Sequence, residues 1–146
     1  MRGLYFEEFE INKEFETVGR TITETDIVNF AGITGDWNQL HTDVEFAKNT
    51  IFGQRIAHGT LIFSIMTGLL VRLGLIEKTI IAFYGVDKLR FTNPVFIGDT
   101  IKVIAKVVEK EDKGTYGIIA IESKVVKQTG DVVLKCILKV AVKKKE

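Results

Sequence analysis

The chain has 146 residues, of which 46% are apolar and 27% are charged, and its formal net charge is +1. These proportions are ordinary for a globular protein, and the length suffices for one hydrophobic core but hardly for two. The small net charge gives no general reason to expect a nucleic-acid partner. We therefore expect a single domain over residues 1–146 that does not bind nucleic acid.

The chain has one cysteine, Cys136, which excludes an intrachain disulfide framework. Cys136 alternates in phase with Leu134 and Leu138, a pattern that indicates a buried structural thiol rather than a nucleophile. The N-terminus has acidic residues where a signal peptide needs an apolar stretch, and the longest apolar run, 61–73, is too short to span a bilayer. The sequence therefore predicts a cytoplasmic protein with no membrane partner.

The first part of the chain is predicted to combine one strand with two helices. Residues 14–22 read as a strand. Thr23 can cap the free N–H groups of a following helix, whose first turn carries favourable acids and which is expected to end near Gly32. A short second helix is predicted over residues 43–49.

Residues 60–73 are apolar nearly all round, which predicts a helix that the rest of the fold must wrap. Gly74 is a natural stop for this helix. A thin polar stripe recurs along it at helical spacing, formed by Thr60, Ser64, Thr67 and Gly68. The stripe is compatible with close packing of small residues against a sheet, or with one wall of a ligand pocket.

The rest of the chain is predicted to form strands, at residues 79–90, 101–109, 115–127 and 131–142. Short glycine-containing turns separate the last three, which is typical of antiparallel hairpins. We predict an α+β fold in which an antiparallel sheet of about five strands, in meander order, wraps one long and fully buried central helix.

The segment with the most chemical information runs from Thr34 to His41 and reads Thr-Gly-Asp-Trp-Asn-Gln-Leu-His. Asp36 and His41 lie five residues apart in it, and the second histidine, His58, precedes Gly59 at the start of the apolar helix. A carboxylate, an imidazole and a helix N-terminus that share one pocket would suit chemistry on a carbonyl compound. By residue type alone, Asp36 also fits a turn, and His41 a helix cap or a core imidazole.

Residues 30–41 closely resemble the hydratase motif of MaoC-like proteins, which are (R)-specific enoyl-CoA hydratases and 3-hydroxyacyl-thioester dehydratases of the hot-dog fold. The heart of that motif is Gly-Asp-x-Asn-Pro-Leu-His, in which this chain has Gln39 in place of the proline. Residues 52–61 resemble the family's loop into its central helix, and residues 91–100 resemble its bend between strands. The matching motif positions are Gly35, Asp36, Asn38, Leu40 and His41.

The resemblance implies reversible hydration of trans-2-enoyl thioesters to (R)-3-hydroxyacyl thioesters. It also implies that Asp36 and His41 activate the water, and that the N–H of Gly59 holds the oxyanion that develops on the thioester. Because Gly59 would begin the apolar helix, its N–H is one of the donors that a helix leaves unpaired.

Four further residues are expected to support the site. Asn38 is expected to tie the catalytic loop by side-chain hydrogen bonds, and His58 to have a structural role rather than to act as a second base. Thr67 aligns with a position that is often serine in the family, where the hydroxyl supports the catalytic acid, although a packing role is equally compatible with the sequence. Ser64, one turn earlier, is the alternative hydroxyl.

We expect no metal and no cofactor beyond the CoA or acyl-carrier thioester that forms part of the substrate. Two histidines and one cysteine at these spacings match no standard metal-ligand pattern, and the chain has no glycine-rich phosphate loop. One sheet around one helix leaves a sheet edge open, and the resemblance implies that two such units pair and continue the sheet. A homodimer or a dimer of dimers is therefore expected.

Two alternatives remain open from the sequence. One is an acyl-CoA thioesterase, since thioesterases share the hot-dog fold. The other is a non-catalytic subunit that binds acyl thioesters beside an active partner.

Overall fold

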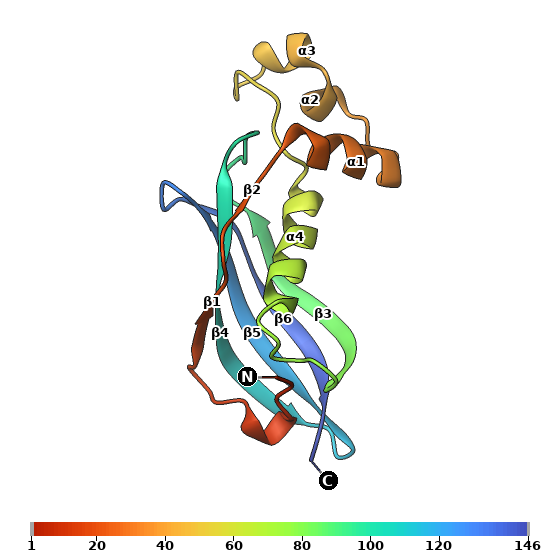
Figure 1. The fold of residues 1–146 in the computed structure, drawn as a ribbon, viewed down its shortest axis with the longest axis vertical. Coiled ribbons are helices and arrows are strands. Elements are labelled where there is room, and N and C mark those ends of the chain that lie inside the picture. Colours follow the sequence, from red (N-terminus) through yellow and green to blue (C-terminus); the bar gives the residue numbers. More distant parts are fainter. Residues whose placement is uncertain (1, 146) are drawn as a thin grey trace.

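A long, curved antiparallel sheet runs the length of the molecule, and helix α4 (Gly59–Val71) lies along one of its faces (Figure 1). The structure is a computed structural model that describes residues 2–145. Three shorter helices gather at the end of the sheet where α4 begins, namely α1 (Glu24–Thr34), α2 (Gln39–Thr42) and α3 (Val44–Lys48). A 3-10 turn, η1 (Phe6–Glu8), lies near the opposite end.

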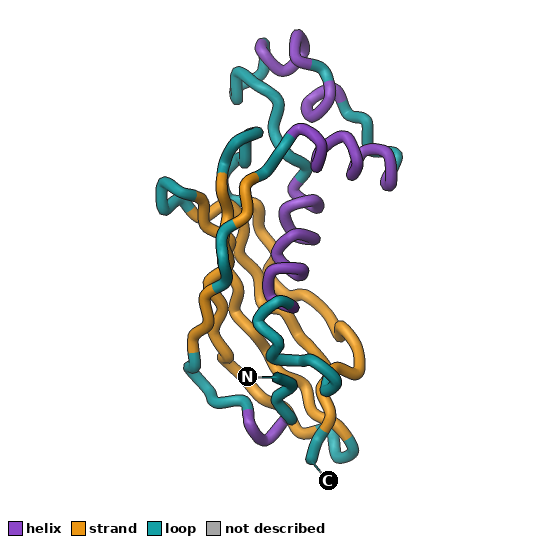
Figure 2. Tube along the Cα trace, viewed as in Figure 1, coloured by secondary structure: helices purple, strands orange, loops and turns teal. Residues whose placement is uncertain are grey.

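The sheet has six antiparallel strands in the order β1-β4-β5-β6-β3, with β2 also paired to β4. The long strands lie side by side in Figure 2. The four long strands expected from the sequence are confirmed, with slightly different bounds. The strands are β1 (Glu14–Glu16), β2 (Arg20–Thr21), β3 (Ile80–Phe91), β4 (Thr100–Asp112), β5 (Tyr116–Lys127) and β6 (Val132–Lys143).

The single strand expected over residues 14–22 is instead divided into β1 and β2. At Thr17 the side-chain hydroxyl, rather than a backbone carbonyl, accepts the hydrogen bond from the N–H of Val103, at 2.9 Å. This side-chain contact interrupts the regular ladder between the two short strands. Alternation of apolar residues does not reveal such an interruption. The N–H of Val103 on the neighbouring strand is still hydrogen-bonded, but to the side chain of Thr17 instead of to a backbone carbonyl.

The predicted meander order is wrong for one strand. Strands β4, β5 and β6 do follow one another as a meander, but β3 pairs with β6 rather than with β4. The connection from β3 to β4, residues 92–99, contains Pro94 and is not a tight hairpin turn. It passes over the end of the sheet where α4 begins, so β3 and β4 lie on opposite sides of the β5–β6 pair. Strand β3 therefore forms a sheet edge.

Helix α4 is buried on one side only, so the prediction of a fully buried helix is wrong for the single chain. Four of its apolar residues pack into the core with at most 7% of their surface exposed, namely Leu61, Ile62, Met66 and Leu69. Thr60, Ser64 and Gly68 are exposed, as is Val71 at 58%. A sheet that curves around one side of a helix leaves the opposite side uncovered, and Thr60, Ser64 and Gly68 of the polar stripe lie on that side.

Two other expectations about single residues are confirmed. Cys136 is buried, and burial raises the pKa of its thiol to about 11, so the thiolate is scarce at neutral pH. Thr23 caps α1, since its hydroxyl accepts from the N–H of Asp26 while the Asp26 carboxylate accepts from the N–H of Thr23. No helix within residues 2–145 is long and apolar enough to cross a membrane.

Candidate functional site

Asp36 lies directly after the C-terminal end of α1. The helix extends to Thr34, and Gly35 ends it with φ of 80°, a left-handed conformation that glycine adopts without steric cost. The N–H of Asp36 then donates to the hydroxyl of Thr34 at 3.1 Å, and its carboxylate accepts from the N–H of Asn38 at 3.3 Å. The helix end thus determines where this exposed carboxylate lies.

His41 lies on α2, a single turn of helix that the sequence analysis missed because four residues show no apolar periodicity. The available signal was Asn38, whose side chain caps α2 by accepting from the N–H of Leu40 at 3.0 Å. Through this bond the side chain of Asn38 ties the start of the helical turn that carries His41. His41 Nδ1 lies 2.8 Å from the carbonyl oxygen of Ile56. Because a carbonyl only accepts, Nδ1 carries the hydrogen and Nε2 keeps a free lone pair.

Gln39, which replaces the proline of the motif, occupies the first position of α2. Proline is favoured there because the N–H at that position has no partner within the helix, so another residue can replace it without loss of a helical bond. The side-chain amide of Gln39 lies 3.4 Å from the carboxylate of Asp43, which caps α3. The departure from the motif therefore leaves the turn that carries His41 in place.

Asp36, His41, His58 and Gly59 line one cavity of about 570 Å³. A carboxylate oxygen of Asp36 and one ring nitrogen each of His41 and His58 lie within 4.8 Å of one another. The structure therefore brings together the three residues to which catalytic roles were assigned from the sequence, with His58 beside them. A single water molecule can bridge two acceptors at this separation.

The environment of His41 favours a neutral imidazole. Burial lowers the pKa of His41 and outweighs the opposing effect of its hydrogen bond to the carbonyl of Ile56. The neighbouring His58 lowers this pKa further, whereas the carboxylate of Asp36 raises it. A ring that is neutral at neutral pH, with Nε2 free, can accept a proton.

Gly59 is the first residue of α4, and the cap residue before it, His58, makes no side-chain cap bond. The first helical hydrogen bond runs from the N–H of Ile62 to the carbonyl of His58, so the earlier N–H groups have no partner within the helix. The positive end of the helix dipole adds to their attraction for an anion. A Cβ on Gly59 would lie 2.8 Å from the ring of Phe91, so the packing also requires glycine here.

The two expected supporting hydroxyls lie outside this cavity, contrary to expectation. Ser64 donates to the carbonyl of Thr60 at 2.8 Å, and Thr67 donates to the carbonyl of Ser64 at 2.7 Å, so neither hydroxyl contacts Asp36. Thr67 instead lines a second, almost wholly apolar cavity of about 250 Å³ between α4 and the sheet. The positions of Ser64 and Thr67 around α4 direct both side chains away from Asp36 and His41.

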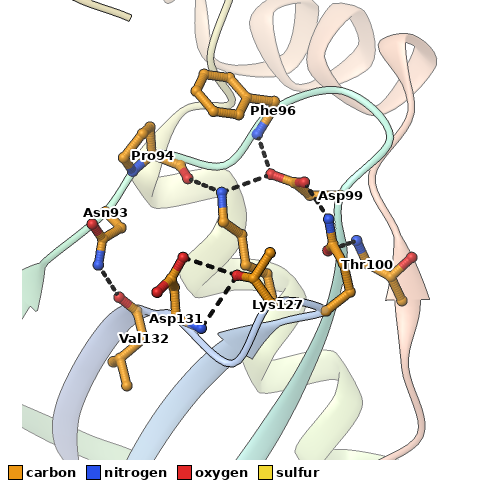
Figure 3. A network of polar contacts seen from close by, with 10 residues as sticks. Asn93, Pro94, Phe96, Asp99, Thr100, Lys127, Asp131 and Val132 are labelled. Atoms are coloured by element: carbon orange, nitrogen blue, oxygen red, sulfur yellow. Dashed lines mark hydrogen bonds and ion pairs between the residues drawn. The ribbon is translucent and has the colours of Figure 1, made fainter.

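One wall of the site cavity, residues 91–95, is continuous with a loop held by a buried ion pair (Figure 3). Lys127 Nζ donates to the Asp99 carboxylate at 3.1 Å and to the carbonyl of Pro94 at 3.0 Å. The same carboxylate accepts from the N–H of Phe96 at 2.8 Å. The side chains of Lys127 and Asp99 are only 10% and 12% exposed, so this charge pair is protected from water.

This loop in turn holds the segment that leads into α4. The N–H of Ala57 donates to the carbonyl of Val95 at 2.8 Å, and Ile56 forms a β-bridge with Phe96. The ion pair thereby anchors both the cavity wall and the approach to Gly59. Neither Lys127 nor Asp99 is apparent from the sequence as a structural residue, because two charges 28 positions apart show no local pattern.

The residues described by the structure include one group of possible metal ligands, Asp36, His41 and His58. The two imidazole rings stack, with centroids 3.9 Å apart and 29° between their planes. One nitrogen of each ring is engaged with a main-chain carbonyl, since His58 Nε2 lies 3.0 Å from the oxygen of Asp36 and His41 Nδ1 lies 2.8 Å from that of Ile56.

Comparisons with known proteins show which sequences and structures this chain is similar to. A family model described as a MaoC-like domain matches residues 7–129. A protein named MaoC from Klebsiella aerogenes is 46% identical over 99 residues, which are 68% of this chain and 29% of the relative's length. A 3-hydroxybutyryl-CoA dehydratase from Methylorubrum extorquens is 38% identical over 109 residues, 75% of this chain and 67% of that protein.

Solved structures show the same fold. A protein from Archaeoglobus, described as a monoamine oxidase regulatory protein, has a TM-score of 0.95 at 43% identity and covers 100% of this chain and 98% of its own. An R-hydratase from Pseudomonas aeruginosa has a TM-score of 0.82 at 29% identity, over 98% of this chain and 88% of its own. A Mycobacterium tuberculosis protein with a double hotdog fold has a TM-score of 0.85 at 20% identity, over 98% of this chain and 45% of its own. The fold is therefore the expected hot-dog fold.

Replacement of Asp99 by asparagine is expected to lower the free energy of unfolding by about 1–3 kcal/mol at pH 7, because it leaves Lys127 buried without its counter-charge. Burial alone would raise the pKa of Asp99, but hydrogen bonds from Gln128, the N–H of Phe96 and Lys127 outweigh it and lower the pKa. The stabilisation is therefore present above the unfolded-state pKa of about 4 and is lost as the pH falls through the lower folded-state value.

Denaturant unfolding of the wild type and Asp99→Asn at a series of pH values measures this difference. Glu10→Gln is the control, because it removes an exposed carboxylate and is expected to change stability by less than about 0.5 kcal/mol. Equal stability of the two variants at pH 7, or a difference that persists at pH values below the folded-state pKa, would contradict the assigned role of the ion pair.

Proposed function

The chain belongs to the MaoC-like domain family, and we propose that it reversibly hydrates trans-2-enoyl thioesters to (R)-3-hydroxyacyl thioesters. The observation that carries the proposal is the convergence of Asp36, His41 and the N-terminal end of α4 at Gly59 in one cavity. Relatives named 3-hydroxybutyryl-CoA dehydratase and (R)-specific enoyl-CoA hydratase support the reaction class.

In the proposed reaction one water molecule lies between the Asp36 carboxylate and His41 Nε2 and donates a hydrogen bond to each. Its oxygen forms a bond to C3 of the enoyl group while one water proton passes to His41 Nε2. The Asp36 carboxylate takes up this proton from His41 and delivers it to C2, which accepts it with the electron pair of the former double bond. The elements of water thus add across the double bond, and the protonation of the protein is unchanged at the end.

Attack at C3 places negative charge on the thioester oxygen, which requires a donor already in position. The N–H of Gly59 provides one at the positive end of the α4 dipole, and backbone donors need no reorganisation as the charge develops. The absence of a side chain at Gly59 lets the thioester approach the backbone closely. Dehydration uses the same contacts in reverse, because both directions pass through the same enolate-like state.

The second, apolar cavity is suited to a hydrocarbon chain. It begins near Thr67, eight residues along α4 from Gly59, which corresponds to roughly 12 Å along the helix axis. Its walls include Leu70, Leu75 and Phe83. We propose that the acyl portion of the substrate extends from the catalytic cavity along α4 toward this space.

Loss of enoyl absorbance with crotonyl-CoA is expected for the wild type, without release of free thiol. Asp36→Asn and His41→Gln are each expected to reduce the rate at least about 100-fold, because each removes one of the two groups that handle the water. Ser64→Ala is the matched control and is expected to retain activity, because the Ser64 hydroxyl donates to a carbonyl of its own helix.

The pH dependence gives a second prediction. Since neutral His41 is the proposed base, kcat/KM should fall as the pH drops through the lowered pKa of His41.

Each other outcome of this assay has a distinct meaning. Thiol release without hydration would contradict the proposal and assign the chain to thioesterase chemistry. Inactivity with crotonyl-CoA, with longer enoyl-CoA substrates and with enoyl acyl-carrier protein would contradict catalysis and favour the non-catalytic thioester-binding subunit.

We also propose that the chain forms a homodimer, or a dimer of dimers, through strand β3. This strand is a sheet edge, and five of its large apolar side chains are exposed in the single chain, namely Ile80, Ile81, Phe83, Tyr84 and Phe91. An uncovered apolar edge favours pairing with another strand. Antiparallel pairing of β3 with its copy satisfies two-fold symmetry and continues the sheet.

The wild type is expected to elute with a mass of roughly two or four times the 16.4 kDa chain in light scattering coupled to size exclusion. Ile81→Glu is expected to shift it toward the monomer, because a charged residue on an edge strand opposes pairing. Ile51→Glu is the matched control, since Ile51 is 96% exposed and lies outside the sheet. A monomeric wild type, or an Ile81→Glu variant with unchanged mass, would contradict the β3 interface.

A further inference from the structure

His58 is almost completely buried at the site, with 1% of its surface exposed, yet the proposed reaction does not use its ring. Its Nε2 lies 3.0 Å from the main-chain oxygen of Asp36. Because this carbonyl only accepts, Nε2 carries the hydrogen, and a neutral ring keeps its lone pair on Nδ1. Nδ1 is buried and has no hydrogen-bond partner within residues 2–145. The ring of His58 therefore makes one directed polar contact, and that contact is with the main-chain oxygen of Asp36.

The ring of His58 also makes two aromatic contacts. It stacks against His41 with centroids 3.9 Å apart, and it meets the edge of Phe30 at 5.0 Å with 62° between the planes. Phe30 belongs to α1, His41 to α2, and His58 itself is the cap residue of α4. One side chain thus contacts each of the elements that carry the proposed catalytic groups, and the next residue in the chain is Gly59.

We propose that His58 is a positioning residue that sets the relative placement of Asp36, His41 and Gly59. Its Nε2–H ties the main chain of Asp36 to the start of α4, and its ring forms the surface on which the imidazole of His41 rests. The inference rests on the proposed hydration, in which three groups from separate elements must act on one small substrate. A displacement of about 1 Å among such groups can cost roughly 100-fold in rate.

The hydrogen bond and the ring make separable contributions. The hydrogen bond holds the backbone of Asp36, whereas the ring shields one face of His41 from water. His41 is otherwise held by its bond to the carbonyl of Ile56, and Asp36 is the other titratable group that faces it. Without the ring, water reaches His41, and the burial that lowers its pKa is relieved. Loss of the ring should therefore raise the pKa of His41.

The chain has only two histidines, so imidazole ¹⁵N spectra contain two ring systems and report each tautomer directly. The expected neutral forms are Nδ1–H for His41 and Nε2–H for His58. A neutral His58 with its hydrogen on Nδ1 would overturn the proposal, because Nε2 could not then donate to Asp36. This measurement requires no activity.

Two substitutions separate the two contributions. His58→Phe keeps a ring against His41 and removes the donor to Asp36; kcat is expected to fall about 10- to 100-fold while KM changes less than about threefold. His58→Gln keeps an amide N–H near the position of Nε2 and removes the ring. In this variant kcat is expected to stay within about tenfold of wild type, while the His41 titration midpoint and the acid limb of kcat/KM both move to higher pH.

A role confined to stability would lower the melting temperature of both variants and leave kcat and the His41 titration of the folded protein unchanged, and that result would overturn the proposal. If His58→Phe does not fold, His58→Gln alone tests the proposal, and an unchanged titration midpoint of His41 in that variant would overturn it. If the wild type hydrates no enoyl thioester, the proposed function fails, whereas the His58 tautomer and the His41 titration still test the positioning role.

Discussion

The burial of one face of α4 against the curved sheet is the constraint on which the site depends. Ile62, Met66 and Leu69 are at most 2% exposed, and full burial of each such side chain contributes about 1.5–3 kcal/mol. This packing sets the direction of the helix and therefore the point at which its N-terminus emerges, at the end of the sheet where α1 to α3 gather (Figure 1). Gly59 lies at that point, and the segment that carries Asp36 and His41 has only to reach it.

The site combines groups with different relations to solvent. Asp36 is exposed at the end of a helix, His41 is partly buried under a second imidazole, and the donor at Gly59 is backbone. Burial lowers the pKa of His41 and favours its neutral form, and the helix terminus supplies positive potential without a charged side chain. The site thus has Asp36 and His41 on one side and the backbone donor of Gly59 on the other. This arrangement suits a reaction in which water is activated at one end of a conjugated thioester and negative charge develops at the other.

Local sequence patterns predicted the helices and strands of this fold better than they predicted which elements pack or pair with one another. Apolar periodicity located α4 and the long strands, and the motif around Asp36 and His41 located the site. The placement of β3 beside β6 depends on long-range pairing, which a local pattern does not specify. The polar stripe of α4 could be read from the sequence, but whether the sheet, a pocket or solvent faces it depends on long-range packing, so the direction of Thr67 could not be predicted. The Lys127–Asp99 pair likewise joins segments that are distant in the sequence.

In the proposed complex the thioester oxygen binds at the N–H of Gly59 while the alkene faces Asp36 and His41. A crystal structure of the Asp36→Asn variant with crotonyl-CoA would show this arrangement, because the substitution slows turnover and keeps the side-chain shape. We expect the thioester oxygen about 3 Å from the Gly59 nitrogen, with C3 facing His41 Nε2. A thioester group bound outside this cavity, or with its oxygen directed away from α4, would rule out the proposed binding mode.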